Sequence, residues 1–228
     1  MELNFNKIID LTHTLTNSIP CWDEKPNYEL KTMIDYQDCP AHAAFKVQCL
    51  CSPLGFGTHI DFPSHMLNNG TTAELFNIES PFYETVVINL QQFMHKNFKI
   101  NIKHILEHEK KYKPLAQNTL ILFYTGWERY WPDPIKYRNN LIFPSMEKET
   151  AEYLIDKSIA GIGIDTLSPD NIESSFEVHK ILLSNGKFIL ENVANTSLLP
   201  ILGAHTLVAP LKIKAATESP LRLIALHK

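Results

Sequence analysis

The sequence predicts a single mixed domain, α+β or α/β in class, built on a substantial and partly antiparallel sheet. Short apolar segments of strand length outnumber the helical segments, which is the pattern of a sheet covered by a few helices. The chain has 228 residues, of which 44% are hydrophobic, so it can bury one sizeable core. No repeat, low-complexity stretch or long linker divides it, and we expect one domain over residues 1–228.

Strands are expected where short runs of apolar and β-branched residues occur. Residues 85–90 form such a run, and residues 119–124 are continuously apolar, as in a strand covered on both faces. The same pattern recurs at residues 162–164, 187–190, 206–213 and 221–226.

Helices are expected in three places between these strands. Ser145 can cap a helix whose first turn is acidic. A second helix should begin near Ser174, because Glu177 stands at capping-box spacing, and it should end at Asn185 and a left-handed Gly186. A third, strongly charged helix is expected around residues 102–111.

The charge balance points to a small-molecule substrate. Charged residues make up 20% of the chain and the net charge is −4, with no basic patch for nucleic acid. The chain shows no signal peptide and no apolar run of the roughly 18 residues that a membrane helix needs. We therefore expect a cytoplasmic protein that binds neither nucleic acid nor membrane. No disulfide scaffold is expected from Cys21, Cys39, Cys49 and Cys51, and Cys49 and Cys51 are expected to be ordinary buried thiols.

The segment with the clearest chemistry is residues 57–65, which reads GTHIDFPSH. His59 and Asp61 are two residues apart, so on an extended strand both side chains point to the same side. Pro63 interrupts the strand and can turn the chain so that His65 returns to the same place. Two imidazoles and a carboxylate suit zinc or manganese. A His-x-Asp pair can also be a simple ion pair near a strand end.

A second segment adds His179 and Glu191. Glu191 follows three apolar residues of an expected strand, where a carboxylate is costly unless it is paired or bound to a metal. His179 by itself would more often be a partly exposed helical histidine. A helix, a glycine cap and a strand would bring the two residues toward one end of the sheet.

These segments resemble the cyclase family, whose best-known members are bacterial kynurenine formamidases and whose relatives include isatin hydrolases. The family pattern is H-x-G-T-H-x-D-x-P-x-H, and His179 and Glu191 follow at the family's spacing. Further similar segments lie at residues 9–12, 20–22, 125–127, 163–170 and 209–213.

The resemblance implies a swivelling β/β/α domain with a mixed sheet, a homodimer or homotetramer, and a two-metal site that often holds zinc. It places His59 on the first metal, His179 on the second, and Asp61 and Glu191 on both. His65 matches the proton donor and acceptor. Trp22 matches a substrate-contacting tryptophan, although its loop differs in length from the family's.

One position departs from the pattern. Gly55 stands where the family's first histidine is expected, and glycine has no side chain to bind a metal. One ion held by three protein ligands and water would suffice for a zinc enzyme. Cys49, Cys51, His42 or an ordered water could replace the missing ligand. We therefore expect a divalent metal, zinc first and manganese second, with one or two ions bound.

The sequence thus predicts a metal-dependent amidohydrolase that opens a small aryl formamide or cyclic amide with a metal-activated water. The alternative is a catalytically inactive family member that binds metal and acts as a binding or interaction protein.

Two competing features are weaker. His104 and His108 belong to an H-x-x-E-H pattern, known from zinc proteases, but the lysines around them indicate a solvated surface helix. Asp165 and Asp170 fit a turn at a strand end, with support of the site as their expected role.

Overall fold

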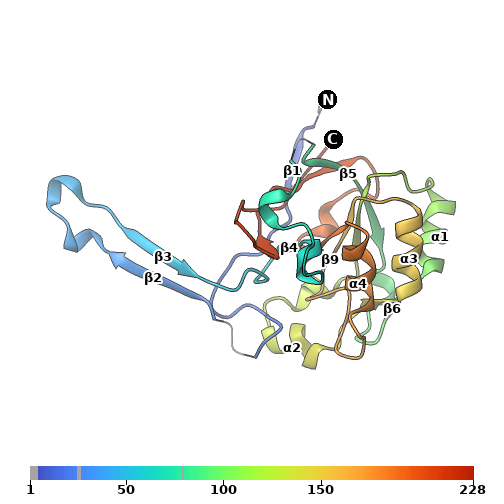
Figure 1. Ribbon diagram of the computed structural model, residues 1–228, viewed down its shortest axis with the longest axis horizontal. Coiled ribbons are helices and arrows are strands. Elements are labelled where there is room, and N and C mark those ends of the chain that lie inside the picture. The colour runs from blue at the N-terminus through green and yellow to red at the C-terminus, as the bar shows by residue number, and fades with distance from the viewer. Residues whose placement is uncertain (1–4, 25–26, 79) are drawn as a thin grey trace.

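A nine-stranded mixed sheet forms the centre of the computed structural model, which describes residues 5–24, 27–78 and 80–228 (Figure 1). β5, β7, β9 and β10 are parallel neighbours, and all other adjacent pairs in the sheet are antiparallel. The sheet confirms the predicted fold class. In spatial order its strands are β1 (Lys7–Asp10), β13 (Ile224–His227), β11 (Ala204–Leu207), β5 (Phe82–Asn89), β7 (Leu120–Tyr124), β9 (Gly161–Ile164), β10 (Phe188–Glu191), β4 (His59–Asp61) and β12 (Glu218–Pro220).

The central strands are buried on both faces because their side chains alternate between two hydrophobic cores. Along β7, Leu120 and Leu122 enter one core, whereas Ile121 and Phe123 enter the other. This explains why the sequence of β7 is continuously apolar rather than alternating.

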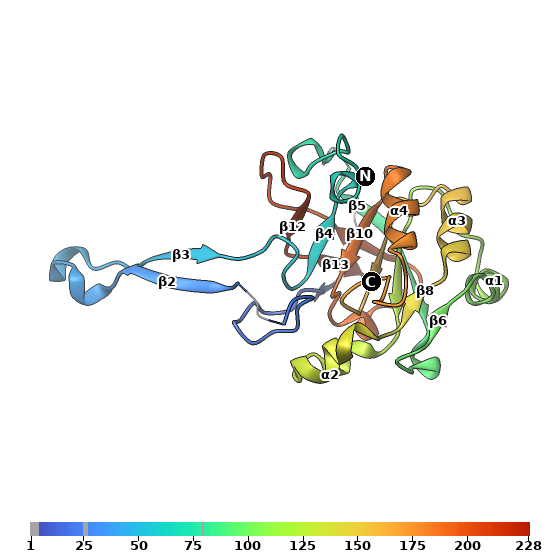
Figure 2. The same cartoon turned by 60° about the horizontal axis from the view of Figure 1, so that its bottom comes forward.

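Three helices pack together on one face of the sheet (Figures 1 and 2). Their buried faces contribute Ile105, Leu154 and Leu182 to the second core. Within the described ranges, no helix has both the length and the apolar composition that crossing a membrane requires. The helices are α1 (Ile102–Lys111), α3 (Lys148–Asp156) and α4 (Glu177–Ser184), and a short α2 (Pro134–Arg138) lies apart from them.

Two small sheets complete the structure. β6 (Lys99–Ile100) pairs with β8 (Ser145–Met146). β2 (Glu29–Ile34) and β3 (Val47–Cys51) form a long hairpin, called the arm below, that projects from the body of the molecule (Figures 1 and 2).

Several predicted boundaries were wrong for identifiable reasons. Ser145 does not cap α3, because it lies in β8 and its hydroxyl accepts a hydrogen bond from Lys99; Glu147 is the residue at the cap. The predicted strand at 206–213 ends at Leu207, shortly before Pro210, which has no N–H for a sheet ladder. The predicted strand at 221–226 is replaced by β13, which begins three residues later.

The start of α4 also differs from the prediction, whereas its end at Asn185 and Gly186 agrees with it. Phe176, with φ of 55°, stands at its start, and Ser174 donates its hydroxyl proton to Asp170 instead of capping the helix. Gly186, with φ of 70°, does adopt the expected left-handed conformation after the helix. α1 has the predicted bounds, and its cap is Asn101.

Candidate metal centre

Three adjacent strands, β10, β4 and β12, carry the carboxylates and one imidazole of the site. His59 and Asp61 lie on one face of β4 because successive side chains of a strand alternate. In the register of the sheet, Glu191 of β10 is paired with His59, and Glu218 of β12 is paired with Asp61. These four side chains therefore share one face of the sheet.

The structure brings together the four residues for which the sequence predicted metal binding. His59 Nε2 lies 3.4 Å from Asp61 Oδ1 and 3.4 Å from Glu191 Oε2. His179 Nε2, on α4, lies 3.5 Å from Asp61 Oδ2 and 3.3 Å from Glu191 Oε1. Each carboxylate thus presents one oxygen to each imidazole. The four residues are only 1–7% exposed.

Hydrogen bonds on the far side of each ring orient the two imidazoles. His59 Nδ1 lies 2.9 Å from the carbonyl oxygen of Gly57, which can only accept, so Nδ1 carries the proton. His179 Nδ1 lies 2.7 Å from Asp170 Oδ2. Both rings can therefore direct an unprotonated Nε2 toward the carboxylates, as a metal-binding histidine does.

The charges of the cluster fit a divalent cation. Asp61 Oδ1 and Glu191 Oε1 are buried atoms without a hydrogen-bond partner among the described residues, which is costly unless another group compensates them. Burial alone lowers the pKa of His59 and His179, but nearby carboxylates outweigh it and hold both pKa values well above the usual range. The position favours positive charge, and a bound cation would take the place of these protons.

His65 and Trp22 lie beside this cluster. His65, at the end of a 3-10 helix (Pro63–His65), has its ring centroid 6.0 Å from that of His179, and its side chain is 34% exposed. Trp22 is separated from the cluster by Phe176, whose ring centroid lies 5.5 Å from Trp22 and 5.9 Å from His179. The structure thus places His65 at the cluster and Trp22 one ring further away.

Glu218 is a polar residue of the site that sequence reasoning missed. Its Oε2 lies 3.6 Å from His65 Nδ1, and single ligand atoms of Asp61, His65 and Glu218 lie within 4.8 Å of one another. Burial and the charge of Asp61 raise the pKa of Glu218, while His65 opposes this. The local sequence, T-E-S-P, offered no signal, because the position of Glu218 depends on the pairing of two distant strands.

The replacement ligands considered from the sequence lie elsewhere. Cys49 and Cys51 are exposed on β3 of the arm, not buried as expected, and His42 is on the 3-10 helix Ala41–Ala43 between β2 and β3 (Figure 1). Within the described part of the chain, two groups of side chains lie close enough to hold an ion: His59 with Asp61 and Glu191, and Asp61 with His65 and Glu218. Neither group includes Cys49, Cys51 or His42.

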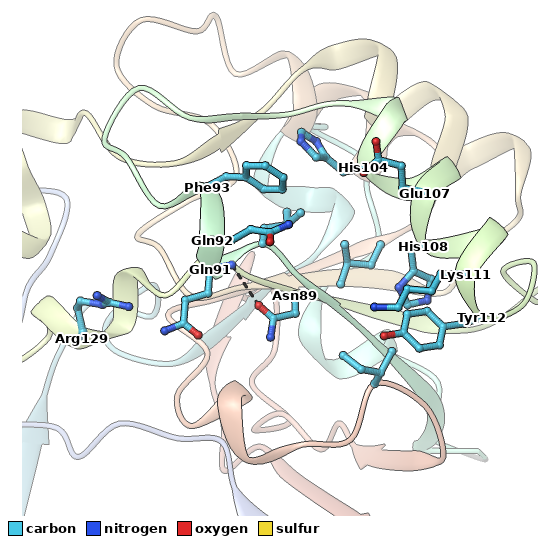
Figure 3. A pocket seen from close by; sticks show the side chains of 13 residues that line it. Asn89, Gln91, Gln92, Phe93, His104, Glu107, His108, Lys111, Tyr112 and Arg129 are labelled. Carbon is cyan, nitrogen blue, oxygen red and sulfur yellow. Dashed lines mark hydrogen bonds between the residues drawn. The ribbon is translucent and has the colours of Figure 1, made fainter.

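The H-x-x-E-H pattern lines a separate pocket of about 630 Å³ (Figure 3). His104 Nδ1 accepts a hydrogen bond from the backbone N–H of Asn101, and its ring contacts Phe93 and Phe98. His104 therefore helps to cap α1. The possible ion-holding groups among the described residues contain neither His104 nor His108.

Comparison with known proteins agrees with the motifs and the geometry. The family model named Cyclase matches residues 9–171. A kynurenine formamidase from Bacillus thuringiensis subsp. konkukian is 26% identical over 221 residues, which is 95% of each chain. An isatin hydrolase from Roseibium aggregatum is 26% identical over 185 residues, covering 75% of this chain and 70% of that protein.

A solved structure extends the agreement to the fold. Isatin hydrolase A from Labrenzia aggregata, bound to benzyl benzoate, superposes with a TM-score of 0.86 at 26% identity. The match covers 97% of this chain and 93% of that one. At that coverage the match extends beyond residue 171, where the family match ends.

Proposed function

This chain belongs to the cyclase family, and from that membership and the geometry of its metal centre we propose that it is a metal-dependent amidohydrolase. Its substrate would be a small aryl formamide or cyclic amide, similar to the N-formylkynurenine and isatin implied by the names of its relatives. One observation carries the proposal: two buried carboxylates, Asp61 and Glu191, each face both His59 and His179.

The residues present suit one or two divalent ions. His59, Asp61 and Glu191 would hold the first ion, and His179 with the same two carboxylates would hold the second. We propose zinc first and manganese second, because both accept nitrogen and oxygen ligands together. Bound there, a dication would polarise the amide carbonyl and make a water molecule nucleophilic near neutral pH.

We propose that His65 moves the proton. It is the most exposed imidazole of the site, so a substrate amide can reach it, while its ring remains next to His179. An imidazole can take a proton from water and pass it to the departing nitrogen of the amide. The nitrogen then leaves as an amine, and the carbonyl carbon becomes a carboxylic acid.

An aromatic wall beside the cluster suits the aryl part of such a substrate. Trp22 and Phe176 are in ring contact, and Phe176 also meets the edge of His179. Aromatic rings favour tilted or edge-to-face packing at these separations. We propose that Trp22 contacts the substrate and that Phe176, which the sequence did not single out, lies between Trp22 and the metals.

We further propose a homodimer or homotetramer in the cytoplasm, formed by a single domain over residues 1–228. The arm leaves large apolar side chains exposed, among them Leu30, Met33, Phe45 and Leu50, each more than half accessible. A second copy of the chain would bury them. The four cysteines are all free, which suits a reducing compartment.

Hydrolysis assays with defined metals test the proposed activity. The protein is stripped of metal, reloaded with zinc or manganese, and supplied with N-formylkynurenine or isatin. Turnover that requires metal supports the amidohydrolase. Metal binding without turnover of either compound or their analogues would favour the alternative, an inactive member that binds metal and serves as an interaction protein.

A further inference from the structure

The space beside His59 that a side chain at position 55 would enter is already filled. A Cβ built on Gly55 would overlap Glu218 Oε1 and would stand 3.4 Å from His59 Nε2. The φ of Gly55 is not in the left-handed region, so the backbone itself would accept a larger residue. It is the Glu218 carboxylate that occupies the place of a ligand projecting from residue 55.

The sheet positions Glu218 for this role. Its pairing with Asp61 in adjacent antiparallel strands puts both side chains on the same face. Glu218 Oε2 faces His65 Nδ1 at 3.6 Å and accepts from Thr217 Oγ1 at 3.4 Å, which leaves Oε1 on the side of Gly55 and His59. The two carboxylate oxygens thus face different neighbours.

A second, independent observation points to a ligand at this place. Asp61 is 1% exposed, and its Oδ1, the oxygen on the side of His59, has no hydrogen-bond partner among the described residues. A buried carboxylate next to a second one is unfavourable without a compensating positive charge. Among the described residues, Glu218 shares a possible ion-holding group with Asp61 and His65, so a cation beside Asp61 and Glu218 would supply that charge.

We propose that Glu218 is a ligand of the first metal ion and takes the place of the side chain that Gly55 lacks. This inference rests on the proposed function, namely that the cluster binds a divalent cation. The first site then has four protein ligands: His59, Asp61, Glu191 and Glu218. A carboxylate from β12 thus replaces the imidazole that the family pattern places at position 55.

The exchange changes the chemistry of the first site. Asp61, Glu191 and Glu218 together bring three negative charges toward the four positive charges of two divalent ions, so two ions can be held close together. One nitrogen and three carboxylates also form an oxygen-rich set, which suits manganese better than a set with two imidazoles does. We expect two ions per chain, with the first site accepting manganese as well as zinc.

Metal titration of the stripped protein by calorimetry tests the inference without relying on activity. The variants are Glu218→Gln, Gly55→His, and the exchange Gly55→His with Glu218→Ala. Glu128→Gln is the matched control, because Glu128 is also a partly buried carboxylate but belongs to neither possible ion-holding group. Melting temperatures of the stripped proteins show whether each variant folds.

The wild-type protein and Glu128→Gln should bind two ions. Glu218→Gln should bind the ion at the first site about tenfold or more weakly, since loss of even an indirect support of a metal ligand typically costs 10–100-fold. Gly55→His alone should strengthen binding less than the exchange variant does, because the Glu218 carboxylate would first have to move aside. The exchange variant should regain the first ion and prefer zinc.

Glu218→Gln with two ions at wild-type affinity would overturn the inference, even if its turnover fell, since Glu218 would then only orient His65. The proposed function would stand in that case. If the wild-type protein binds neither zinc nor manganese, both the inference and the proposed function fail.

Discussion

Asp170→Asn should weaken metal binding although Asp170 does not face the metal centre. Asp170 Oδ2 accepts from both the backbone N–H and ring Nδ1 of His179, at 3.0 and 2.7 Å. Its Oδ1 accepts from the hydroxyl of Ser174 at 2.7 Å and from the backbone N–H of Val178 at 3.4 Å. Asparagine has only one acceptor oxygen, so one side of this network must lose its partner.

The loss of metal affinity depends on whether the His179 side or the Ser174 side of residue 170 loses its acceptor oxygen. If the amide NH₂ faces His179, it can only donate to Nδ1. The ring proton then moves to Nε2 and blocks the nitrogen that we propose binds metal. Loss of such an outer partner typically lowers metal affinity 10–100-fold, or about 1.4–2.8 kcal/mol. The unpaired buried donors should also lower the free energy of unfolding of the stripped protein by about 1–3 kcal/mol.

Calorimetric zinc titration and urea unfolding of the stripped protein separate these effects. Asp165→Asn is the matched control, because Asp165 is equally buried but accepts from the N–H and hydroxyl of Thr125 instead. It should lose stability and keep its metal affinity. Wild-type zinc affinity in Asp170→Asn would refute the view that Asp170 orients His179 for a metal.

Three further predictions concern other parts of the chain. His65→Gln should retain its metal but lose about 10²–10⁴-fold in turnover of a hydrolysed amide, as expected for a proton-transfer residue; loss of metal would make His65 a ligand instead. Replacing both His104 and His108 by alanine should leave metal content unchanged, and a fall would revive the H-x-x-E-H interpretation. Burial, opposed by the charge of Asp10, lowers the pKa of His13 from 6.5 to about 4. The unfolded chain then binds the proton more tightly, so this contribution to stability is complete above pH 6.5 and is lost as the pH falls toward 4, by up to about 3 kcal/mol. Urea unfolding at pH 7 and pH 4.5 should show a smaller loss in His13→Gln than in the wild type; equal losses would contradict this.

The local parts of the site were predictable because they depend on short-range geometry. His59 and Asp61 obey the two-residue period of a strand, and Pro63 ends that strand where the pattern indicated. Glu191 was conspicuous because a carboxylate followed a buried apolar run. His179 became credible only through the family resemblance, since its partner Asp170 is nine residues away and meets it through the start of α4.

The rest of the site depends on pairing between distant segments. Glu218 reaches Asp61 only because β12 adds to the free edge of β4, and nothing in its own neighbourhood predicts that strand. The arm was missed because its residues are exposed on both faces and show no apolar period. Both Ser145 and Ser174 look like helix caps, but their hydroxyls bond to Lys99 and Asp170. Tertiary partners thus overrode the local capping preference.

The most direct test of the central claim is the metal content per chain of the purified protein, measured by elemental analysis beside Asp61→Asn. Asp61 faces both imidazoles, so neutralising it should remove nearly all metal. We expect at least one zinc or manganese ion per wild-type chain and almost none in the variant. A wild-type protein that retains no metal even after supplementation, or a variant with the full content, would contradict it.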